Sequence, residues 1–404
     1  MNDVIPNDWE LVNLGTLGSF AKGAGIRKDE ALSGEIPAVR YGELYTDHPE
    51  ILRAHRSFIS AEISKSARPI KCGDILFAGS GETKEEIGKC TGFLGDYEAF
   101  AGGDIIVFRP NGPDPRFLAY MLNSAPIAKQ KAQRAQGDAV VHIYPDALRR
   151  LSLPLPSLHE QQAIAAALSD ADGVVAGLER VIAKKRLIKQ GAMQDLLTAR
   201  RRLPGFSGEW EEATLSELAD IRSGGTPSTS DATLWDGDIA WVTPTDITAL
   251  DGRKFLSGTT RTISRAGLRQ SSAELLPEGT IVMTSRATIG ECAISTIPLT
   301  TNQGFKNFIA KNRADRDFLY YLLTSQKKGF IELCSGSTFL EIGKTQLTGY
   351  TVRVPETKRE QQAISTVLSD MDAEIQTLEG RLTKARAVKE GMMQNLLTGR
   401  VRLV

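Results

Sequence analysis

Two stretches of the chain repeat apolar residues in alternating steps of four and three positions. This spacing keeps one apolar seam along a helix and is the heptad pattern of a helix that packs against a partner helix. The seam residues are Ile164, Leu168, Ala171, Val175, Leu178 and Ile182, then Ile364, Leu368, Met371, Ile375, Leu378, Leu382 and Ala385. Pro156 and Pro355 stand just upstream, where proline is tolerated before a helix. We therefore predict two long helices.

These helical stretches are copies of each other. The motif Glu-Gln-Gln-Ala-Ile starts at Glu160 and again at Glu360, and further identical runs follow each copy. A weaker echo links the segments that precede the helices, such as Trp9-Glu10 and Trp210-Glu211. The chain thus has the order A–B–A′–B′. We place the four parts at residues 1–157, 158–203, 204–355 and 356–404.

The A and A′ parts have a mixed pattern. Short β-like runs at 104–108 and 279–283 alternate with glycine-rich turns, and apolar residues at helical spacing follow at 117–124 and 318–325. About 150 residues is the size of one compact domain. The predicted fold class is therefore α+β, with two similar globular domains joined by two long helices and related by pseudo-twofold symmetry.

A long helix cannot bury its apolar seam alone. Because the first helix leads away from A and the second returns from A′, the simplest arrangement is an antiparallel coiled coil of the two. The alternative is two separate helices, each packed on its own domain.

Composition and charge are those of a soluble globular protein. The 404 residues include 49 Lys and Arg against 49 Asp and Glu, so the net charge is zero. Free-standing nucleic-acid binders are usually basic, so DNA binding would need a local patch or a partner that contributes phosphate contacts. The acidic start of the chain lacks the pattern of a signal peptide, and no apolar run is long enough to span a membrane. We expect a cytoplasmic protein without a membrane partner.

No catalytic constellation is apparent in the sequence. The histidines His48, His55, His142 and His159 lack metal-ligand spacing, and the cysteines form no C-x-x-C pair. The run from Gly79 to Lys84 lacks the order of a phosphate-binding loop. The Pro-Pro of adenine methyltransferases is absent, and so is a dinucleotide-binding glycine motif. We therefore expect that the chain is not an enzyme by itself and binds no metal.

The duplication suggests what the chain could recognise. Two similar domains related by a pseudo-twofold axis suit a DNA duplex, whose backbone is itself twofold symmetric. Because A and A′ differ, each could read different bases, and the target would be bipartite and asymmetric with an unread spacer. Basic residues at 184–189, 200–202 and 384–402 could face DNA or a partner, or could simply form a solvated helix surface.

The repeated motifs resemble those of a known family. The A–B–A′–B′ order, the paired Glu-Gln-Gln-Ala-Ile helices, the run 193–198 and the segment 202–206 before Trp210-Glu211 look like the specificity subunit of type I restriction–modification enzymes. The resemblance covers essentially the whole chain. It implies two target recognition domains, helical spacers and binding to double-stranded DNA.

The resemblance also implies partners and the location of cofactors. Two methyltransferase subunits and two restriction subunits would join the chain in a complex that cleaves unmethylated DNA. S-adenosylmethionine, ATP and Mg²⁺ would be bound by those partner subunits, and no cofactor by this chain.

Polar side chains on loops are the candidates for reading bases, since such groups reach base edges. In A they are Arg40, Tyr41, Ser80, Thr83 and Lys84, and in A′ they are Thr243, Ser285, Arg286, Thr288, Asn302, Gln303 and Lys306. The candidates for the coiled coil or a partner interface are Ile164, Leu168, Val175, Leu178, Ile182, Ile364, Leu368, Ile375, Leu378 and Leu382.

Two other functions compete with DNA recognition. A stand-alone methyltransferase or nuclease is disfavoured because cofactor and metal motifs are missing from the sequence. A protein-binding scaffold would use two domains without touching DNA. Divergence of A from A′ beside near-constant helices favours DNA, although it also fits two protein ligands.

Overall fold

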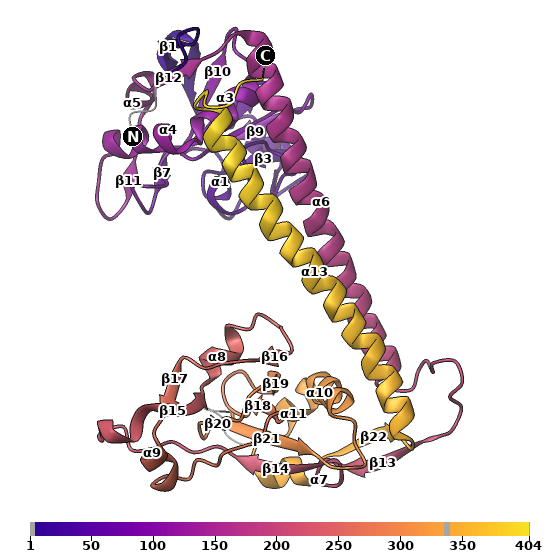
Figure 1. The fold of residues 1–404 in the computed structure, drawn as a ribbon. Coiled ribbons are helices and arrows are strands. Elements are labelled where there is room, and N and C mark those ends of the chain that lie inside the picture. The colour runs from indigo at the N-terminus through magenta and orange to yellow at the C-terminus, as the bar shows by residue number, and fades with distance from the viewer. Residues whose placement is uncertain (1–4, 335–339, 404) are drawn as a thin grey trace. The chain divides into compact units, whose positions relative to one another are not determined.

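The computed structural model describes residues 5–334 and 340–403. The chain forms two compact units, and each combines a globular part with portions of both long helices, α6 (Leu158–Leu196) and α13 (Lys358–Leu396) (Figure 1). Unit 1 comprises residues 1–180 and 379–404, and unit 2 comprises residues 181–378. The division therefore falls inside both helices, whereas the predicted domain limits were placed at the helix ends.

Unit 1 contains one antiparallel and one mixed sheet, each of four strands. One has the strand order β2–β10–β6–β8 and the other β4–β3–β9–β5; β3 and β9 run parallel. The short pairs β1–β12 and β7–β11 complete it. The elements are β1 (Glu10–Asn13), η1 (Leu14–Thr16), β2 (Gly18–Lys22), β3 (Ile36–Val39), α1 (Glu43–Thr46), β4 (Ser57–Ile59), α2 (Ala61–Ser64), β5 (Arg68–Ile70), β6 (Ile75–Ala78), β7 (Ser80–Gly81), β8 (Cys90–Gly92), β9 (Ala99–Ala101), β10 (Ile105–Pro110), α3 (Pro115–Leu122), α4 (Ala125–Arg134), β11 (Val141–His142), α5 (Pro145–Arg149) and β12 (Ser152–Leu155).

Unit 2 repeats this plan. Its sheets have the orders β14–β21–β18–β19–β16 and β17–β15–β20, with the pair β13–β22, and β15 and β20 run parallel as β3 and β9 do. The elements are β13 (Trp210–Thr214), α7 (Leu215–Leu218), β14 (Ala219–Ser223), η2 (Ala232–Leu234), β15 (Trp235–Val242), α8 (Pro244–Thr248), β16 (Phe255–Leu256), β17 (Arg261–Ile263), α9 (Arg265–Arg269), β18 (Ile281–Thr284), β19 (Cys292–Ser295), β20 (Thr300–Thr301), β21 (Phe305–Ala310), α10 (Arg316–Ser325), α11 (Lys327–Glu332), α12 (Lys344–Thr348) and β22 (Thr351–Pro355). The prediction of two similar α+β domains is confirmed.

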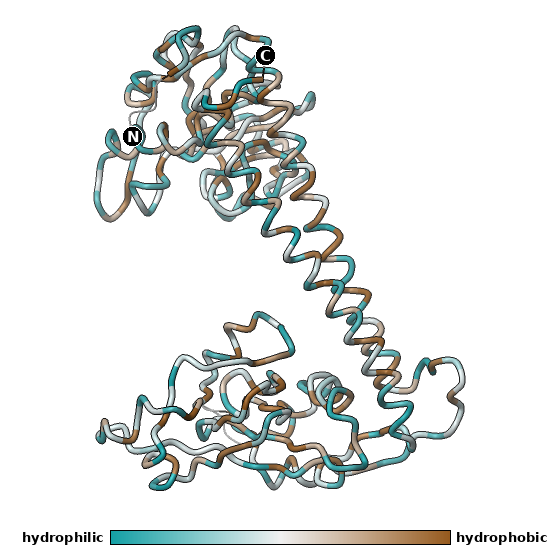
Figure 2. Tube along the Cα trace, viewed as in Figure 1, coloured by the Kyte–Doolittle hydropathy of each residue, from teal (hydrophilic) through white to brown (hydrophobic). Residues whose placement is uncertain are grey.

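One helix organises each globular core. In unit 1, α3 begins at the N-cap Asp114, whose carboxylate accepts hydrogen bonds from the amides of Arg116 and Phe117 at 2.9 and 3.0 Å. Its apolar side packs with the first turns of α6 and with Leu396 and Leu397. In unit 2, α10 packs likewise with α13, Leu196 and Leu197. Each core therefore includes residues from both long helices. Figure 2 shows hydrophobic segments running through each globular part.

The first glutamine of each repeated Gln-Gln pair explains part of the duplicated motif. The side-chain oxygen of Gln161 accepts a hydrogen bond from the amide of Asp114 at 2.9 Å, and its nitrogen donates to the Pro156 carbonyl at 2.8 Å. Gln361 makes the same two kinds of bond, to Asp315 at 2.8 Å and Pro355 at 3.3 Å. Each glutamine thus fastens a spacer helix to the N-terminus of the core helix.

Within each unit the two long helices run antiparallel. In unit 1, Glu179 pairs with Arg386 at 2.6 Å and Asp172 with Lys389 at 2.7 Å, so positions on α13 rise as those on α6 fall. In unit 2, Lys185 pairs with Glu374 at 2.6 Å. The antiparallel pairing is confirmed. Of the predicted seam residues, Ile164, Leu168, Ile182, Ile364, Leu368 and Ile375 are buried, and Val175, Leu178, Leu382 and Leu378 are half-buried.

We expect Leu378→Glu to destabilise unit 2 by about 1–3 kcal/mol, because it places a carboxylate in a half-buried apolar seam. Thr377→Glu is the matched control, since Thr377 is exposed on the next position of the same helix. Urea unfolding of both variants measures the difference. Equal stability of the two variants would show that position 378 does not belong to a packed seam.

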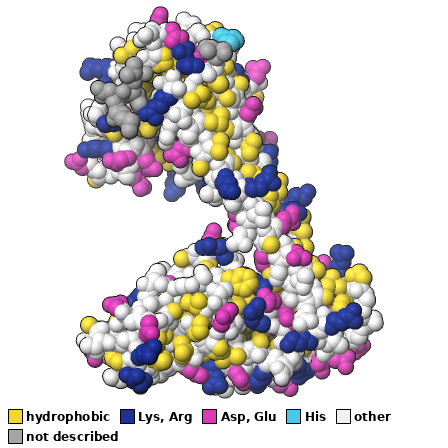
Figure 3. Space-filling model, viewed as in Figure 1, with side chains coloured by type: hydrophobic (Ala, Val, Ile, Leu, Met, Phe, Trp, Pro, Cys, Tyr) yellow, Lys and Arg dark blue, Asp and Glu magenta, His cyan; other side chains and the backbone are white. Residues whose placement is uncertain are grey.

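Charges of both signs cover the surface. On the face shown in Figure 3, Lys and Arg side chains are interspersed with Asp and Glu over each unit, in keeping with the zero net charge. Among the described residues, no helix has the length and apolar character that crossing a membrane would require.

Candidate nucleic-acid interface

Three loops of unit 2 that carry predicted base-reading residues meet at one place. The amide of Asn302 donates to the carbonyl of Val242 at 3.0 Å, which sets Asn302 beside Thr243. The amide of Ser285 donates to the carbonyl of Gly304 at 2.7 Å. The turn between β20 and β21 therefore joins the end of β15 to the end of β18. We call this region loop cluster 2, defined as residues 243–246, 285–288, 302–306 and 341.

Arg286 projects from loop cluster 2 as half of an ion pair. Its guanidinium lies 2.9 Å from the carboxylate of Glu341, and both side chains are partly exposed. Ser285 and Lys306 lie beneath the pair and are buried, with Lys306 Nζ 3.5 Å from Ser285 Oγ. Burial lowers the pKa of Lys306, which the nearby carboxylate of Glu341 partly offsets. Thr288 and Gln303 are exposed, and Asn302 is half-buried.

The equivalent loops of unit 1 meet in the same way. The amide of Gly102 donates to the Val39 carbonyl at 2.9 Å, and the amide of Gly79 donates to the Asp104 carbonyl at 2.7 Å. The turn between β9 and β10 thus joins the end of β3, where Arg40 and exposed Tyr41 follow, to the end of β6. Loop cluster 1 comprises residues 40–43, 79–84, 102–104 and 142. Its turn has glycines at 102 and 103 where unit 2 has Asn302 and Gln303.

Two of the candidate residues that follow β6, Ser80 and Lys84, contact a second segment, residues 136–142. Ser80 is buried, and its Oγ lies 2.9 Å from Nδ1 of His142. Lys84 Nζ pairs with Asp138 at 3.1 Å on the surface, and Thr83 is exposed. The loop is therefore lined by residues 136–142 along its length.

A buried acid holds the loop that follows the first strand of each parallel pair. In unit 2, Asp246 accepts hydrogen bonds from the amide and hydroxyl of Thr243, both at 2.7 Å, and from those of Thr260, both at 2.8 Å. Burial opposes the ionised form, but these hydrogen bonds outweigh it and hold the pKa of Asp246 below its usual value. In unit 1, Glu43 accepts from the Arg40 amide at 3.3 Å. These acids fix the positions of Arg40 and Thr243.

Two residues of the loop clusters were missed by sequence reasoning, His142 and Glu341. Both belong to a segment far along the chain that returns to the loop after β6 or β18. A weak signal does exist: Ile143 and Leu148 in unit 1 have the spacing of Ile342 and Leu347 in unit 2, and all four are buried. This shared spacing shows that the two segments are equivalent, but it does not predict which loop each of them contacts.

Six basic residues near the helix ends form ion pairs within their own unit. Lys185, Lys189, Arg202, Arg386, Lys389 and Arg402 all form ion pairs with acids of their own unit. Arg202, for example, donates two hydrogen bonds of 2.6 and 2.7 Å to the carboxylate of Glu360. Lys185, Lys189 and Arg386 therefore join the two long helices to each other. Lys389 and Arg402 also pair with Glu50 and Asp8 of the globular part.

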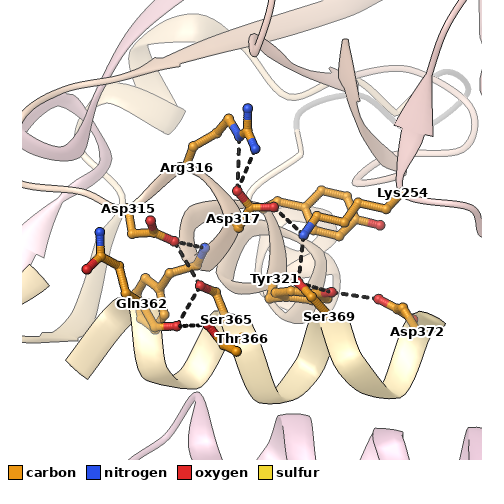
Figure 4. A network of polar contacts seen from close by, with 12 residues as sticks. Lys254, Asp315, Arg316, Asp317, Tyr321, Gln362, Ser365, Thr366, Ser369 and Asp372 are labelled. Carbon is orange, nitrogen blue, oxygen red and sulfur yellow. Dashed lines mark hydrogen bonds and ion pairs between the residues drawn. The ribbon is translucent and has the colours of Figure 1, made fainter. Parts of the chain in front are cut away.

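Figure 4 shows how polar groups fasten α10 to α13 in unit 2. The Tyr321 hydroxyl donates to Asp372 at 2.6 Å, and Lys254 Nζ donates to Ser369 Oγ at 3.0 Å and pairs with Asp317. Burial, followed by the hydrogen bond to Asp372, raises the pKa of Tyr321. In unit 1, Tyr120 donates to Asp172 at 2.7 Å. Polar contacts thus connect the globular part of each unit to its long helices.

Within the described ranges, His, Cys, Asp and Glu side chains nowhere gather in a group of three or more that could hold a metal ion. Cys90 and Cys292 are buried, and burial raises the pKa of each thiol to about 12.

Comparison with known proteins identifies the family. The model of the type I restriction modification DNA specificity domain matches residues 6–185 and again 207–386. The MjaIX specificity subunit of Methanocaldococcus jannaschii is 37% identical over 166 residues, which are 41% of this chain and 38% of that one. The MjaVIII specificity subunit of the same organism is 25% identical over 99% of this chain and 94% of its own length.

Solved structures share the fold. The S subunit of a type I restriction–modification system from M. genitalium matches with a TM-score of 0.61 and 16% identity, over 98% of both chains. A chain from a study of assembly and conformational transition of the type I system matches with a TM-score of 0.60 and 18% identity, over 98% of this chain and 100% of that one. With two matched copies of the domain, the chain belongs to the family of type I restriction–modification DNA specificity domains.

Proposed function

We propose that this chain reads a bipartite, asymmetric DNA site, with loop cluster 1 reading one half and loop cluster 2 the other. The proposal rests on the contrast between a backbone framework that repeats in both units and loops whose side chains differ. Equivalent backbone hydrogen bonds build both clusters, yet position 40 is Arg where 243 is Thr, and Gly102 stands where unit 2 has Asn302. A shared frame with different side chains is what two different base sequences require.

The chemistry of the exposed and half-buried candidates suits base edges. Arginine can donate two hydrogen bonds to guanine, and asparagine or glutamine can donate to and accept from adenine. Arg40, Arg286, Asn302 and Gln303 supply these groups, with Tyr41, Thr83, Lys84, Thr243 and Thr288 beside them. Ser80, Ser285 and Lys306 are buried, so we propose that they pack inside the loops and stabilise them.

The neutral charge of the chain supports a shared role with partners. Non-specific affinity for DNA comes mainly from neutralised phosphates, and the ion-paired helix residues of this chain contribute little to it. We propose that two methyltransferase subunits, and two restriction subunits with them, supply the remaining phosphate contacts and the catalysis. S-adenosylmethionine, ATP and Mg²⁺ would then be bound by those partners. A cytoplasmic location fits this role.

Sequencing of methylated bases in the native cells, with and without the gene, tests the proposal. The strain must express the methyltransferase subunit, which mass spectrometry can verify. Loss of one bipartite, asymmetric methylated motif on deletion, and its return on complementation, is the expected result. An unchanged pattern of methylation would contradict the proposal and favour a protein-binding scaffold.

Arg286→Ala should weaken binding to the cognate duplex by about 1–3 kcal/mol, the usual contribution of a good side-chain contact to a base. The partly exposed ion pair with Glu341 is worth little to folding, so stability should change by less than about 1 kcal/mol. Titration of the complex with duplex at fixed salt gives the affinity. Arg265→Ala, which removes an exposed ion pair with Asp238 outside loop cluster 2, is the control. Equal affinities of the two variants would remove Arg286 from the interface.

A further inference from the structure

In each unit, a segment from farther along the chain returns to lie beside the proposed base-reading loop. In unit 1, the amide of Ile143 donates to the carbonyl of Gly79 at 3.0 Å, and His142 is opposite Ser80 in the β7–β11 pair. In unit 2, the amide of Ile342 donates to the carbonyl of Ser285 at 3.1 Å, and Glu341 is opposite Arg286 in an isolated bridge. The same register places the two cross-strand pairs, Ser80–His142 and Arg286–Glu341, at equivalent positions.

The side chains of the two pairs differ in charge. Ser80 and His142 form a single hydrogen bond of 2.9 Å, whereas Arg286 and Glu341 form an ion pair of 2.9 Å. The strand next to them differs too. Lys306 pairs in register with Met283, and the equivalent Ile106 pairs with Phe77. Unit 2 thus has an ion pair and a lysine where unit 1 has a hydroxyl–imidazole hydrogen bond and an isoleucine, on the same backbone.

From these pairs we propose that His142 and Glu341 determine base specificity, each together with the residue opposite it. This inference rests on the proposed function. It adds which residues select a base in each half-site, and which base is selected by unit 2. In unit 2, Nη2 of Arg286 lies 2.9 Å from the carboxylate of Glu341, and within the described ranges the other N–H groups of the guanidinium have no second partner. Two such parallel donors match O6 and N7 of guanine. The position read by this pair is therefore a guanine.

In unit 1 the Ser80–His142 pair selects by hydrogen-bond direction. Ser80 occupies Nδ1 of His142, and Nε2 has no partner among the described residues. The imidazole stacks on the exposed ring of Tyr144, with centroids 6.3 Å apart and planes at 27°. When the Ser80 hydroxyl donates to Nδ1, Nε2 carries the proton and donates to a base acceptor. Ser80 thereby acts as a positioning residue for His142.

Selection from randomised duplexes tests both assignments. The chain is assembled with its methyltransferase subunits, the bound duplexes are sequenced at fixed salt, and preferences are compared position by position. We expect Glu341→Gln to reduce the preference for guanine at one position of one half-site by roughly 5- to 150-fold, with the other half-site unchanged. We expect His142→Ala to relax a position in the opposite half-site only.

Matched controls separate reading from folding. Glu211→Gln removes a 2.8 Å ion pair with Arg313 in unit 2, at similar exposure, and should leave both half-sites unchanged. His159→Ala is the control for His142, since His159 is exposed on α6. The double variant Arg286→Glu with Glu341→Arg keeps an ion pair in reversed order. A purely structural pair would retain the original guanine preference in that variant, and this result would overturn the inference.

The same experiment also separates failure of this inference from failure of the proposed function. If the wild-type complex selects a bipartite motif and both single variants keep it, the function stands and His142 and Glu341 are not specificity residues. If the wild-type complex selects no sequence, the proposed function fails and the inference falls with it.

Discussion

Replacing Lys389 with methionine is expected to destabilise unit 1 by about 3 kcal/mol. Lys389 is largely buried and lies 2.7 Å from both Asp172 and Glu50. Burial disfavours its charge, but attraction to these two carboxylates outweighs it and raises the pKa of Lys389. Removal of one partner from a buried ion pair leaves an uncompensated charge, which costs about 3–5 kcal/mol. Arg53, 3.5 Å from Asp172, compensates in part, so the lower end applies.

Urea unfolding and amide hydrogen exchange would measure this effect. Exchange should quicken in α3, because Tyr120 of α3 donates to Asp172, and should remain unchanged in α10 of unit 2. Arg386→Met is the control on the same helix, where an exposed pair with Glu179 contributes no more than about 1 kcal/mol. Equal stability of the two variants would mean that the Asp172 network does not hold unit 1 together.

Arg202→Ala is expected to destabilise unit 2 by a similar amount, about 3 kcal/mol. The guanidinium makes two hydrogen bonds to Glu360, whose side chain is buried. Among the residues that the structure describes, its only other hydrogen-bond donor is the Trp210 indole at 3.4 Å. Loss of the arginine strands a buried carboxylate. Arg201→Ala changes an exposed neighbour and serves as the control. An undiminished unfolding free energy in Arg202→Ala would show that Glu360 is adequately solvated without its partner.

The matching pair in unit 1 adds a pH dependence. Hydrogen bonds from Arg402, at 2.6 and 2.8 Å, lower the pKa of Glu160 below its ordinary value near 4.5. A carboxyl whose pKa is lower in the folded state stabilises the fold above its unfolded pKa, and this contribution is lost as the pH falls. The stability difference between wild type and Arg402→Ala should therefore be largest near neutral pH and shrink below about pH 4.

The sequence predicted the parts of the fold that depend on local periodicity or on repetition. The heptad spacing from Ile164 and Ile364 predicted both long helices, and the echo of Trp9-Glu10 in Trp210-Glu211 predicted a second copy of the α+β domain. Both signals are visible within short windows. The antiparallel pairing also followed, because the order of the segments left one simple way to bury the seam.

Long-range contacts were beyond that reasoning. The pairing of Lys389 with Asp172 joins residues from opposite halves of the chain, and periodicity does not reveal it. The positions of His142 and Glu341 depend on strand register, which tertiary packing decides. Lys306 was predicted as a donor near a turn, but it lies on β21 with its side chain buried. The contacts of the candidate residues with DNA remain predictions.

The composition of the two units bears on the order in which they form during synthesis. Unit 2 is one continuous stretch, residues 181–378, and all the residues of its core emerge together from the ribosome. The core of unit 1 includes Leu396 and Leu397, which are made only after unit 2 is complete. Domains usually fold from the N-terminus onward. Here the core of unit 1 cannot be completed until the end of α13 has been synthesised, so unit 2 can reach its native state first.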